Sequence, residues 1–240
     1  MSRVVLVTGG ARRLGAEIVR SFATRGDAVA IHHGRSPEDA QALASALRAN
    51  GTRAHVVQAD LTDPSSPQRI VDDVVSVFGR LDVLVSSASV LMRHAFDAVT
   101  PAEWDAVEAV NLRAPFFLMQ AAARVMREGG VIVQMSDHLA FETTSPMFIP
   151  HQVTKAALTQ LVRTVAAALA PRIRVNAVAP GLVLSPEKLS DEARRQFLKD
   201  VPMGREGNPR DVVQAIQYLV DAPYVTGSIL QVDGGRHLWR

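Results

Sequence analysis

Short runs of β-branched and other apolar residues alternate along the whole chain with longer amphipathic stretches, and this alternation leaves few folds possible. Seven runs are predicted strands: Val4–Thr8, Ala28–His32, Ala54–Gln58, Leu81–Ser86, Val131–Met135, Ile173–Ala179 and Ile229–Val232. The stretches between them are predicted helices: Leu14–Thr24, Pro37–Asn50, Ser65–Phe78, Pro101–Arg127, Gln152–Ala170 and Pro209–Val220. Continuous apolar runs are typical of parallel strands buried on both faces. The pattern predicts an α/β fold, a doubly wound Rossmann-type three-layer sandwich with a seven-stranded parallel sheet.

A single domain, 1–240, accommodates the chain, because 240 residues are enough for one large core. No cysteine is present, which excludes disulfides, thiolate metal sites and cysteine nucleophiles, and we expect no metal. The apolar runs are too short to cross a membrane and no signal peptide is visible, so we expect a cytoplasmic protein without a membrane partner. The 26 basic residues are scattered rather than gathered into a stripe, which disfavours nucleic-acid binding.

The first predicted strand leads into a glycine-containing turn, Thr8 to Gly15, and then into a predicted helix. In this arrangement free N–H groups and the helix dipole converge on an anion such as a pyrophosphate. Gly9 permits a tight turn, and Gly15 allows the helix to pack closely on the strand. The turn therefore predicts a dinucleotide site, although such a turn also occurs without a ligand.

The end of the second predicted strand indicates which dinucleotide binds. Folds that bind NAD usually carry Asp or Glu at this place, whereas here Arg35 and Ser36 follow the strand. Their charge and hydrogen-bond donors, with Arg13 nearby, suit a 2′-phosphate. We therefore expect NADPH/NADP+ as the cofactor. The alternative is that Arg35 is an ordinary solvated cation of a loop.

Several ordered motifs resemble those of the short-chain dehydrogenase/reductase family over essentially the whole chain. The matching segments are Thr8 to Gly15, Asp60-Leu61, Asn111, Lys155, Asn176 with Pro180-Gly181, and Val232 to Gly235. Arg13-Leu14-Gly15, His32 to Ser36 and Ser136-Asp137 resemble in particular the pteridine reductases and dihydromonapterin reductases. The resemblance implies cofactor contacts at Gly9, Arg12, Arg13, Leu14, Gly15, Arg35, Ser36, Asp60, Leu61, Ser87, Ala88, Ser136, Lys155, Pro180 and Gly181.

The resemblance also implies roles for single residues. Asp60 is expected to accept a hydrogen bond from the adenine amino group, and the Leu61 amide completes that contact. Asn111 is expected in a kinked helix, where it holds a water in a proton relay to Lys155. The residues themselves allow plainer interpretations, with Asp60 as a turn residue and Asn111 as a buried polar residue bonded to the backbone.

The most informative departure from the family concerns its proton donor, a tyrosine four residues before the lysine. Here His151 stands at that position ahead of Lys155, and both tyrosines, Tyr218 and Tyr224, lie far downstream. An imidazolium, whose ordinary pKa is near ~6.5, can donate a proton to a developing anion. One alternative is that the acid has been lost, leaving a nucleotide-binding scaffold or a narrow reaction that draws its proton elsewhere. Another is that His151, beside Pro150, is merely a surface residue.

Asp137 offers another route for the proton, since the resemblance to pteridine reductases extends to an Asp where most relatives carry a catalytic Ser. Strand register aligns Asp137 with that position, whereas distance from His151 alone would select His138. We favour the alignment by strand register, which selects Asp137, because loops after strands absorb insertions easily. The expected catalytic residues are His151, Lys155, Asp137 and Asn111, and the expected substrate contacts are Leu91, Asp137, His138, His151 and Leu182. Plainer alternatives are a solvated acid at Asp137 and core packing at Leu182.

These features together predict an NADPH-dependent reductase that transfers a hydride to a C=N or C=O group of a small cyclic substrate, a pterin or related heterocycle. The alternatives are a carbonyl or 3-oxoacyl reductase and a catalytically silent NADP-binding or assembly protein. The charged region 182–208 is expected to be a loop that covers the substrate. By the family resemblance we expect a homotetramer that buries stripes of Pro101–Arg127 and Gln152–Ala170 between subunits.

Overall fold

Seven parallel strands form one sheet in the computed structural model, which describes residues 2–143, 145–184 and 190–238. The strands are β1 (Val4–Thr8), β2 (Ala28–His33), β3 (Ala54–Gln58), β4 (Val83–Ser86), β5 (Gly130–Met135), β6 (Ile173–Pro180) and β7 (Ile229–Val232). Their order is β3-β2-β1-β4-β5-β6-β7, so the order reverses at the β1–β4 pair. The predicted Rossmann-type sheet is thereby confirmed. In such sheets ligands bind outside the carboxyl ends of the strands at the reversal.

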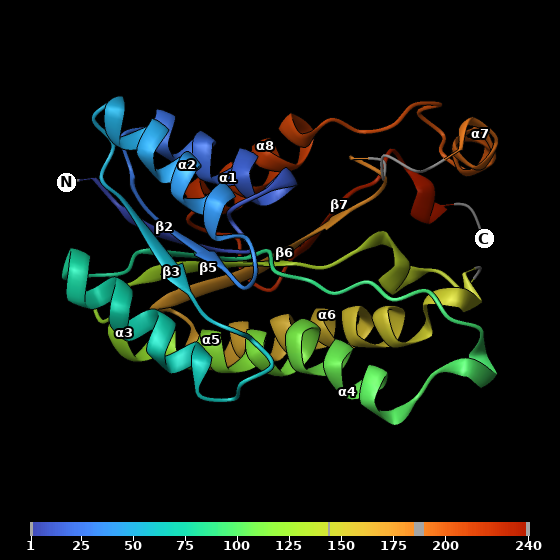
Figure 1. Ribbon diagram of the computed structural model, residues 1–240, viewed down its shortest axis with the longest axis horizontal. Coiled ribbons are helices and arrows are strands. Elements are labelled where there is room, and N and C mark those ends of the chain that lie inside the picture. Colours follow the sequence, from blue (N-terminus) through green and yellow to red (C-terminus); the bar gives the residue numbers. More distant parts are fainter. Residues whose placement is uncertain (1, 144, 185–189, 239–240) are drawn as a thin grey trace.

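Helices cover both faces of the sheet and give the molecule three layers (Figure 1). They are α1 (Arg13–Thr24), α2 (Pro37–Ala49), α3 (Ser66–Phe78), α4 (Pro101–Glu108), α5 (Ala114–Val125), α6 (Ile149–Leu169), α7 (Asp191–Lys199) and α8 (Pro209–Asp221). Helices α1, α2 and α8 pack on one face, and α3, α5 and α6 pack on the other. In β1, Val5 and Val7 face the first apolar cluster while Val4 and Leu6 face the second, which explains the continuous apolar run.

The helix predicted as one element over Pro101–Arg127 is divided into α4 and α5, which corrects the sequence expectation. A π-helical turn, Ala109–Arg113, separates the two. Pro115 accounts for the wider turn, because it has no N–H to bond the Asn111 carbonyl and its ring displaces that carbonyl. The kink implied by the family resemblance is therefore present, and it places Asn111 toward the carboxyl ends of the strands.

The region 182–208, expected as a loop, contains a helix that sequence analysis did not predict. Helix α7 begins after Ser190, whose hydroxyl accepts a hydrogen bond from the Ala193 amide at 3.2 Å. Residues 185–189 of this region lie outside the described residues.

Helix α6 begins three residues earlier than predicted, at Ile149 rather than Gln152. Pro150 is tolerated there because the first turn of a helix needs no N–H from that position. The earlier start places His151 within the first helical turn rather than ahead of the helix. In the described parts of the chain, none of the helices is both long and apolar enough to span a membrane.

Candidate active site

The turn between β1 and α1 is a tight backbone cradle. Gly9 has φ +64°, and a Cβ on it would lie 2.9 Å from the Ala88 Cα. A Cβ on Gly15 would collide with the Gly9 carbonyl oxygen. The Thr8 hydroxyl accepts hydrogen bonds from the Ser87 and Ala88 amides at 3.0 and 3.2 Å, which ties the turn to the end of β4. The start of α1 has no side-chain cap, so its first amides can bind an anion.

Two arginines flank this turn, and one of them has a strained backbone. Arg13 adopts φ +50°, which is uncommon outside glycine, and its guanidinium donates to the Leu184 carbonyl at 2.7 Å. Arg12 is exposed, with its Nε 3.7 Å from an Asp39 carboxylate oxygen. Leu14 packs against the apolar cluster beneath α1. The turn therefore presents cations outward and an apolar side chain inward.

His32 lies buried at the end of β2, directly behind the turn. Its Nδ1 accepts a hydrogen bond from the Gly9 amide at 3.3 Å, and its Nε2 donates to the Ala59 carbonyl at 3.1 Å. Both bonds require the neutral ring, and burial lowers the pKa of His32 from 6.5 to about 4. The uncharged imidazole thus links the turn to the end of β3.

Arg35, Ser36 and Asp60 follow the carboxyl ends of β2 and β3, next to the turn. Arg35 and Asp60 are exposed, Ser36 is half-buried and Leu61 is buried. The Asp60 Oδ1 accepts hydrogen bonds from the Thr62 amide at 2.9 Å and the Thr62 hydroxyl at 2.8 Å. These bonds, with the nearby charge of Arg35, lower the pKa of Asp60. Asp60 is therefore a turn residue whose ionised carboxylate remains accessible to a ligand.

Asn111 is fully buried in the π-helical turn, and its amide group bonds the Val90 backbone. Its Oδ1 accepts from the Val90 amide at 2.8 Å, and its Nδ2 donates to the Val90 carbonyl at 2.9 Å. The Ser89 hydroxyl donates to the same Oδ1 at 3.1 Å, and Nδ2 lies 3.3 Å from the His151 Nδ1. Asn111 therefore fixes the segment after β4 against His151.

His151 is buried in the first turn of α6, with 4% of its surface exposed, so the surface-residue alternative is wrong. Its Nδ1 lies 3.0 Å from the Val90 carbonyl oxygen, and its Nε2 lies 3.3 Å from an Asp137 carboxylate oxygen. A carbonyl and an ionised carboxylate can only accept hydrogen bonds, so the doubly protonated ring satisfies both contacts. The Asn111 Nδ2, which can only donate, lies 3.3 Å from the same Nδ1, so this ring nitrogen faces one acceptor and one donor.

Asp137 follows β5, and its two carboxylate oxygens face two different imidazoles. Oδ2 faces His151, whereas Oδ1 lies 3.6 Å from the Nε2 of His138 and accepts from the Leu139 amide at 2.9 Å. Burial raises the pKa of Asp137, but the hydrogen bond from His151 and the charges of His138 and His151 outweigh burial and lower it overall. Asp137, the residue favoured by register, is thus the one that faces His151.

Lys155 is buried on α6, one turn after His151. Its Nζ donates to the Met135 carbonyl at 2.6 Å, and the Ser136 hydroxyl lies 3.4 Å from the Lys155 carbonyl. Burial lowers the pKa of Lys155 from 10.5 to about 8, although the charge of Asp137 acts in the opposite direction. The ammonium is therefore still the main form at neutral pH.

The remaining expected contacts lie around this centre. Pro180 ends β6, and a Cβ on the following Gly181 would lie 2.8 Å from the Asp233 Cα, so the strand end packs closely on the chain after β7. Leu91 is 58% exposed and Leu182 is half-buried. The structure thus joins His151, Asp137 and Asn111 by direct contacts, whereas Leu91 stands apart on the surface.

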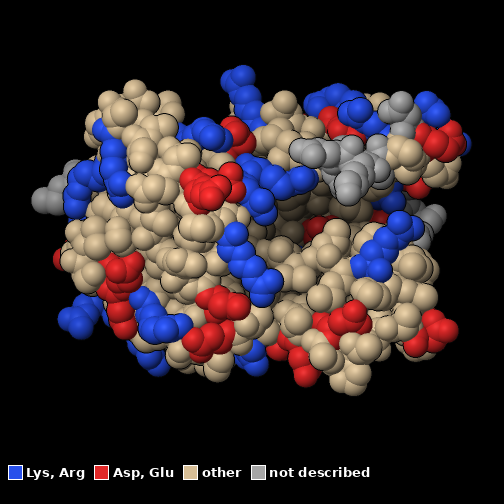
Figure 2. All heavy atoms as spheres, in the orientation of Figure 1, with Lys and Arg blue, Asp and Glu red and all other residues tan. Residues whose placement is uncertain are grey.

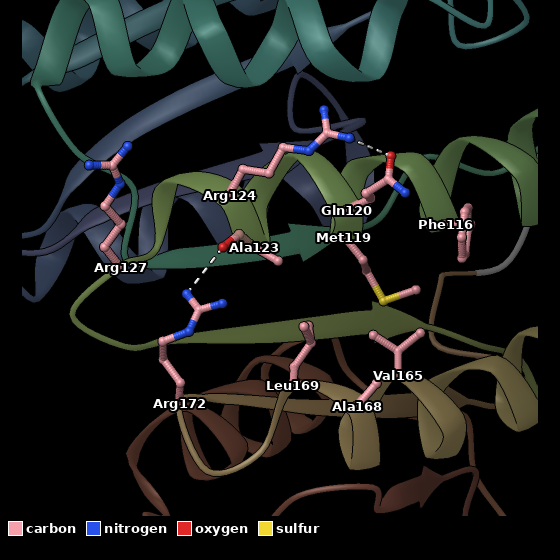
Figure 3. Close-up of a pocket in the computed structure, with 10 residues that line it drawn as sticks. All are labelled: Phe116, Met119, Gln120, Ala123, Arg124, Arg127, Val165, Ala168, Leu169 and Arg172. Carbon is pink, nitrogen blue, oxygen red and sulfur yellow. Dashed lines mark hydrogen bonds between the residues drawn. The ribbon is translucent and has the colours of Figure 1, made fainter.

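The molecular surface is hollowed toward the α7 side, where Figure 2 shows acidic atoms on the floor and Lys and Arg side chains at the rim. A separate cavity of about 610 Å³ lies between α5 and α6 (Figure 3). Apolar side chains line most of it, and Arg124, Arg127 and Arg172 gather toward one end. None of the expected site residues lines this second cavity.

Val90, Glu142 and Arg236 shape the site but were not identified from the sequence. Val90 acts through its backbone, which no side-chain motif can signal. Glu142 accepts from the Arg236 Nε at 2.8 Å and lies 2.6 Å from the His138 Nδ1, although Glu142 and Arg236 are 94 residues apart in sequence. Despite these acids and imidazoles, the described residues contain no group of three or more placed to hold a metal ion.

Comparison with known proteins shows similarity over nearly the entire chain. A family profile described as Enoyl-(Acyl carrier protein) reductase matches residues 9–237. The 3-oxoacyl-[acyl-carrier-protein] reductase FabG of Staphylococcus aureus is 33% identical over 245 residues, covering 99% of each chain. A short-chain dehydrogenase/reductase mutant of Serratia marcescens has a TM-score of 0.93 and 34% identity, covering 98% of each chain. FolM alternative dihydrofolate reductase 1 from Brucella canis, complexed with NADP, has a TM-score of 0.92 and 35% identity, covering 99% of this chain and 95% of that one.

Proposed function

The chain belongs to the short-chain dehydrogenase/reductase family of oxidoreductases, and from this premise we propose that it is an NADPH-dependent reductase of a small cyclic substrate, a pterin or related heterocycle. The observation that carries this proposal is the hydrogen-bonded pair of buried His151 and half-buried Asp137 at the carboxyl end of the sheet. Reduction of a C=N or C=O group needs a hydride and a proton, and this pair holds a proton beside the dinucleotide cradle. The name of the NADP-bound FolM relative, a dihydrofolate reductase, supports the pterin class.

The cradle fits a dinucleotide phosphate. Gly9 and Gly15 leave no room for a Cβ, and the uncapped start of α1 offers amide donors. Arg13 and Arg35 expose guanidinium groups that suit a 2′-phosphate, and Lys155 is proposed to orient the nicotinamide ribose. When bound, NADPH supplies the hydride.

His151 is proposed to supply the proton. The Val90 carbonyl holds the ring's Nδ1–H, so Nε2 is the nitrogen that can release its proton. Asp137 keeps that nitrogen protonated before substrate enters, because its lowered pKa leaves it a carboxylate. The same carboxylate can accept a hydrogen bond from a ring N–H or amino group, which is a feature of pterins and related heterocycles.

A carbonyl substrate such as a 3-oxoacyl thioester is the second candidate. Leu91 offers an exposed aliphatic surface after β4, which packs on an acyl chain but cannot stack on a flat ring as an aromatic would. The name of the FabG relative supports this class. A silent scaffold is disfavoured, because a buried ammonium at Lys155 is costly to keep unless it serves the site.

The test follows NADPH oxidation with dihydropterins and 3-oxoacyl thioesters, for the native chain beside His151→Tyr and Asp137→Asn. We expect the native chain to reduce a dihydropterin, His151→Tyr not to improve it, and Asp137→Asn to lower kcat by about 100-fold, in line with general acid catalysis. Turnover of thioesters alone would establish the second candidate. Activity confined to His151→Tyr would show that the native site is degenerate for this chemistry.

We further propose that the chain assembles as a homotetramer through α5 and α6. Phe116 and Phe117 are each 38% exposed on α5, and the apolar cavity of Figure 3 opens between the two helices. Contiguous exposed apolar surface of this kind marks protein–protein interfaces.

A further inference from the structure

A second buried imidazole contacts the carboxylate that bonds His151. His138 is 8% exposed, and its Nε2 lies 3.6 Å from the Asp137 Oδ1, while the His151 Nε2 lies 3.3 Å from the Oδ2. One carboxylate therefore stands between two imidazoles. The terminal torsion of an Asp side chain is soft, so a small rotation of the carboxylate brings the longer contact to hydrogen-bond length.

Glu142 and Arg236 fix the orientation of this second imidazole. The His138 Nδ1 lies 2.6 Å from the Glu142 Oε1, and Arg236 donates to the two Glu142 oxygens at 2.8 and 3.3 Å. Burial raises the pKa of Glu142, but the hydrogen bonds from His138 and Arg236 outweigh burial and lower it overall. Glu142 therefore stays ionised and keeps the proton on Nδ1, which leaves Nε2 of His138 as the nitrogen that exchanges a proton with Asp137.

Helix α7 and the chain after β7 close the other sides of His138. The Phe197 ring lies edge-on to His138 with centroids 5.7 Å apart, and the Arg236 guanidinium stacks 4.0 Å from the same Phe197 ring. Among the described residues, the charged groups around His138 are Asp137, Glu142 and Arg236, and Asp200, directly after α7, lies 3.8 Å from Arg236. Acidic and nitrogen-bearing side chains alternate from His151 to Arg236, so the Asp137 carboxylate lies on the path of a proton between the two imidazoles.

We propose that His138 is a positioning residue that reloads the proton donor, acting on His151 through Asp137. When His151 gives its Nε2 proton to the reduced substrate, a proton leaves the His138 Nε2, crosses the Asp137 carboxylate and arrives at the His151 Nε2. His138 then keeps its Nδ1–H against Glu142 and regains the Nε2 proton from water. One proton is consumed for each hydride transferred, and no other reactant is needed. The inference rests on the proposed function, because it presumes that His151 is the donor.

The kinetic test compares His138→Gln with the native chain and with His55→Gln, using a substrate identified in the NADPH assay. His55 lies on β3, at the far edge of the sheet, and is a matched control because its Nε2 lies 2.8 Å from a carboxylate oxygen of Asp73 on α3. We expect His138→Gln to lower kcat about tenfold with the KM for NADPH unchanged, and added imidazole to restore most of the loss. Native kcat in His138→Gln, or a loss that imidazole does not restore, would overturn the proposal.

A titration that needs no turnover separates this inference from the proposed function. In protein labelled with ¹³C at the histidine Cε1, we expect His138→Gln to shift the midpoint of the His151 ring titration by at least half a pH unit, both alone and with NADP+. His55→Gln is expected to leave it unchanged. An unchanged His151 titration in His138→Gln would overturn the coupling. A shifted titration in a chain that reduces no substrate would preserve the coupling and remove the proposed function instead.

Glu142→Gln provides a second variant if His138→Gln does not fold. It retains the imidazole but removes the carboxylate that keeps the Nδ1 proton in place. The same shift of the His151 titration is expected, in the same direction as in His138→Gln and smaller, and its absence would count against the proposal.

Discussion

His32 and His151 are both buried, yet their hydrogen-bond partners differ. His32 faces one donor, the Gly9 amide, and one acceptor, the Ala59 carbonyl, which suits a neutral ring. His151 faces two acceptors, the Val90 carbonyl and the Asp137 carboxylate, and one donor, the Asn111 Nδ2. At the scale of single residues, the neighbours rather than the residue type therefore decide which histidine only links backbone groups and which contacts a carboxylate.

The buried neutral ring of His32 predicts a loss of stability in mild acid. Its pKa is 6.5 in the unfolded chain and about 4 in the folded one, so only the unfolded chain binds this proton between those values. The free energy of unfolding should fall by up to about 3 kcal/mol from pH 6.5 to pH 4, with no contribution from this ring above pH 6.5. Urea unfolding across this range should show that the free energy of unfolding falls less steeply toward acid pH in His32→Gln than in the native chain. The same slope in the two proteins would contradict the prediction.

The strained backbone of Arg13 predicts opposite effects of glycine at two adjacent positions. Arg13→Gly relieves the backbone strain of φ +50°. Arg12 already has an ordinary φ of −137°, so Arg12→Gly only raises the conformational entropy of the unfolded chain. The free energy of unfolding should be about 1 kcal/mol higher for Arg13→Gly than for Arg12→Gly. Arg13→Gly should also weaken NADPH binding severalfold, because a guanidinium is lost. Chemical denaturation and fluorescence titration of NADPH measure the two effects. Equal stabilities would show that the turn carries no strain at Arg13.

At the scale of elements, two irregular features bring the site together. The π-helical turn between α4 and α5 places Asn111 where it bonds the Val90 backbone, and Val90 in turn contacts His151. The turn between β1 and α1 holds the helix start against the end of β4 through Thr8. Both features depend on one residue each with special backbone chemistry, Pro115 in the first and Gly15 in the second.

Gly15→Ala is expected to disrupt the start of α1, because its Cβ would collide with the Gly9 carbonyl oxygen. We expect NADPH binding to weaken by about tenfold or more, which corresponds to about 1.4 kcal/mol. Gly34→Ala is the matched control, since its Cβ would meet only the Ala59 carbonyl oxygen at an ordinary 3.8 Å. Isothermal titration with NADPH compares the two. Native affinity in Gly15→Ala would mean that α1 can shift without harm to the cradle.

At the scale of the whole molecule, the carboxyl end of the sheet and the outer surface of one helical layer differ in character. The carboxyl end carries the cradle and the His151–Asp137 pair, while the outer surface of α5 and α6 carries an apolar cavity that contains no site residue (Figure 3). That cavity is the basis for the proposed tetramer, because apolar surface exposed on this scale is stabilised by burial against another subunit.

Ala168→Glu places a charge in the cavity between α5 and α6 and should break the assembly. We expect sedimentation velocity to show a tetramer for the native chain and smaller species for Ala168→Glu. Figure 3 shows Ala168 beside Val165, away from the end where the arginines gather, so the new carboxylate would be buried among apolar side chains at a cost. Val77→Glu is the matched control, because Val77 is exposed on α3, outside the proposed interface. A native chain that sediments as a stable monomer would refute the tetramer.

The order of the secondary structure was predictable because it depends on local patterns. Strands β1, β3 and β7 have the predicted bounds, and the cradle was visible as Gly9 and Gly15 at a strand–helix junction. Apolar periodicity did not show the break within Pro101–Arg127, where only the family resemblance implied a kink at Asn111, and helix α7 was missed. The first follows from Pro115, whose effect is visible only when the helix is built, and the second lies in a charged segment with little apolar periodicity.

The sequence by itself therefore determined the parallel sheet, the glycine turn at the first strand–helix junction and the presence of a histidine four residues before Lys155. Only the tertiary structure decided what that histidine can do. His151 gains its partners from Val90 and Asp137, which lie on other elements, and Glu142 meets Arg236 across 94 residues of sequence. Periodicity and turn chemistry act between near neighbours in the chain, whereas burial and charge state depend on groups that only folding brings together.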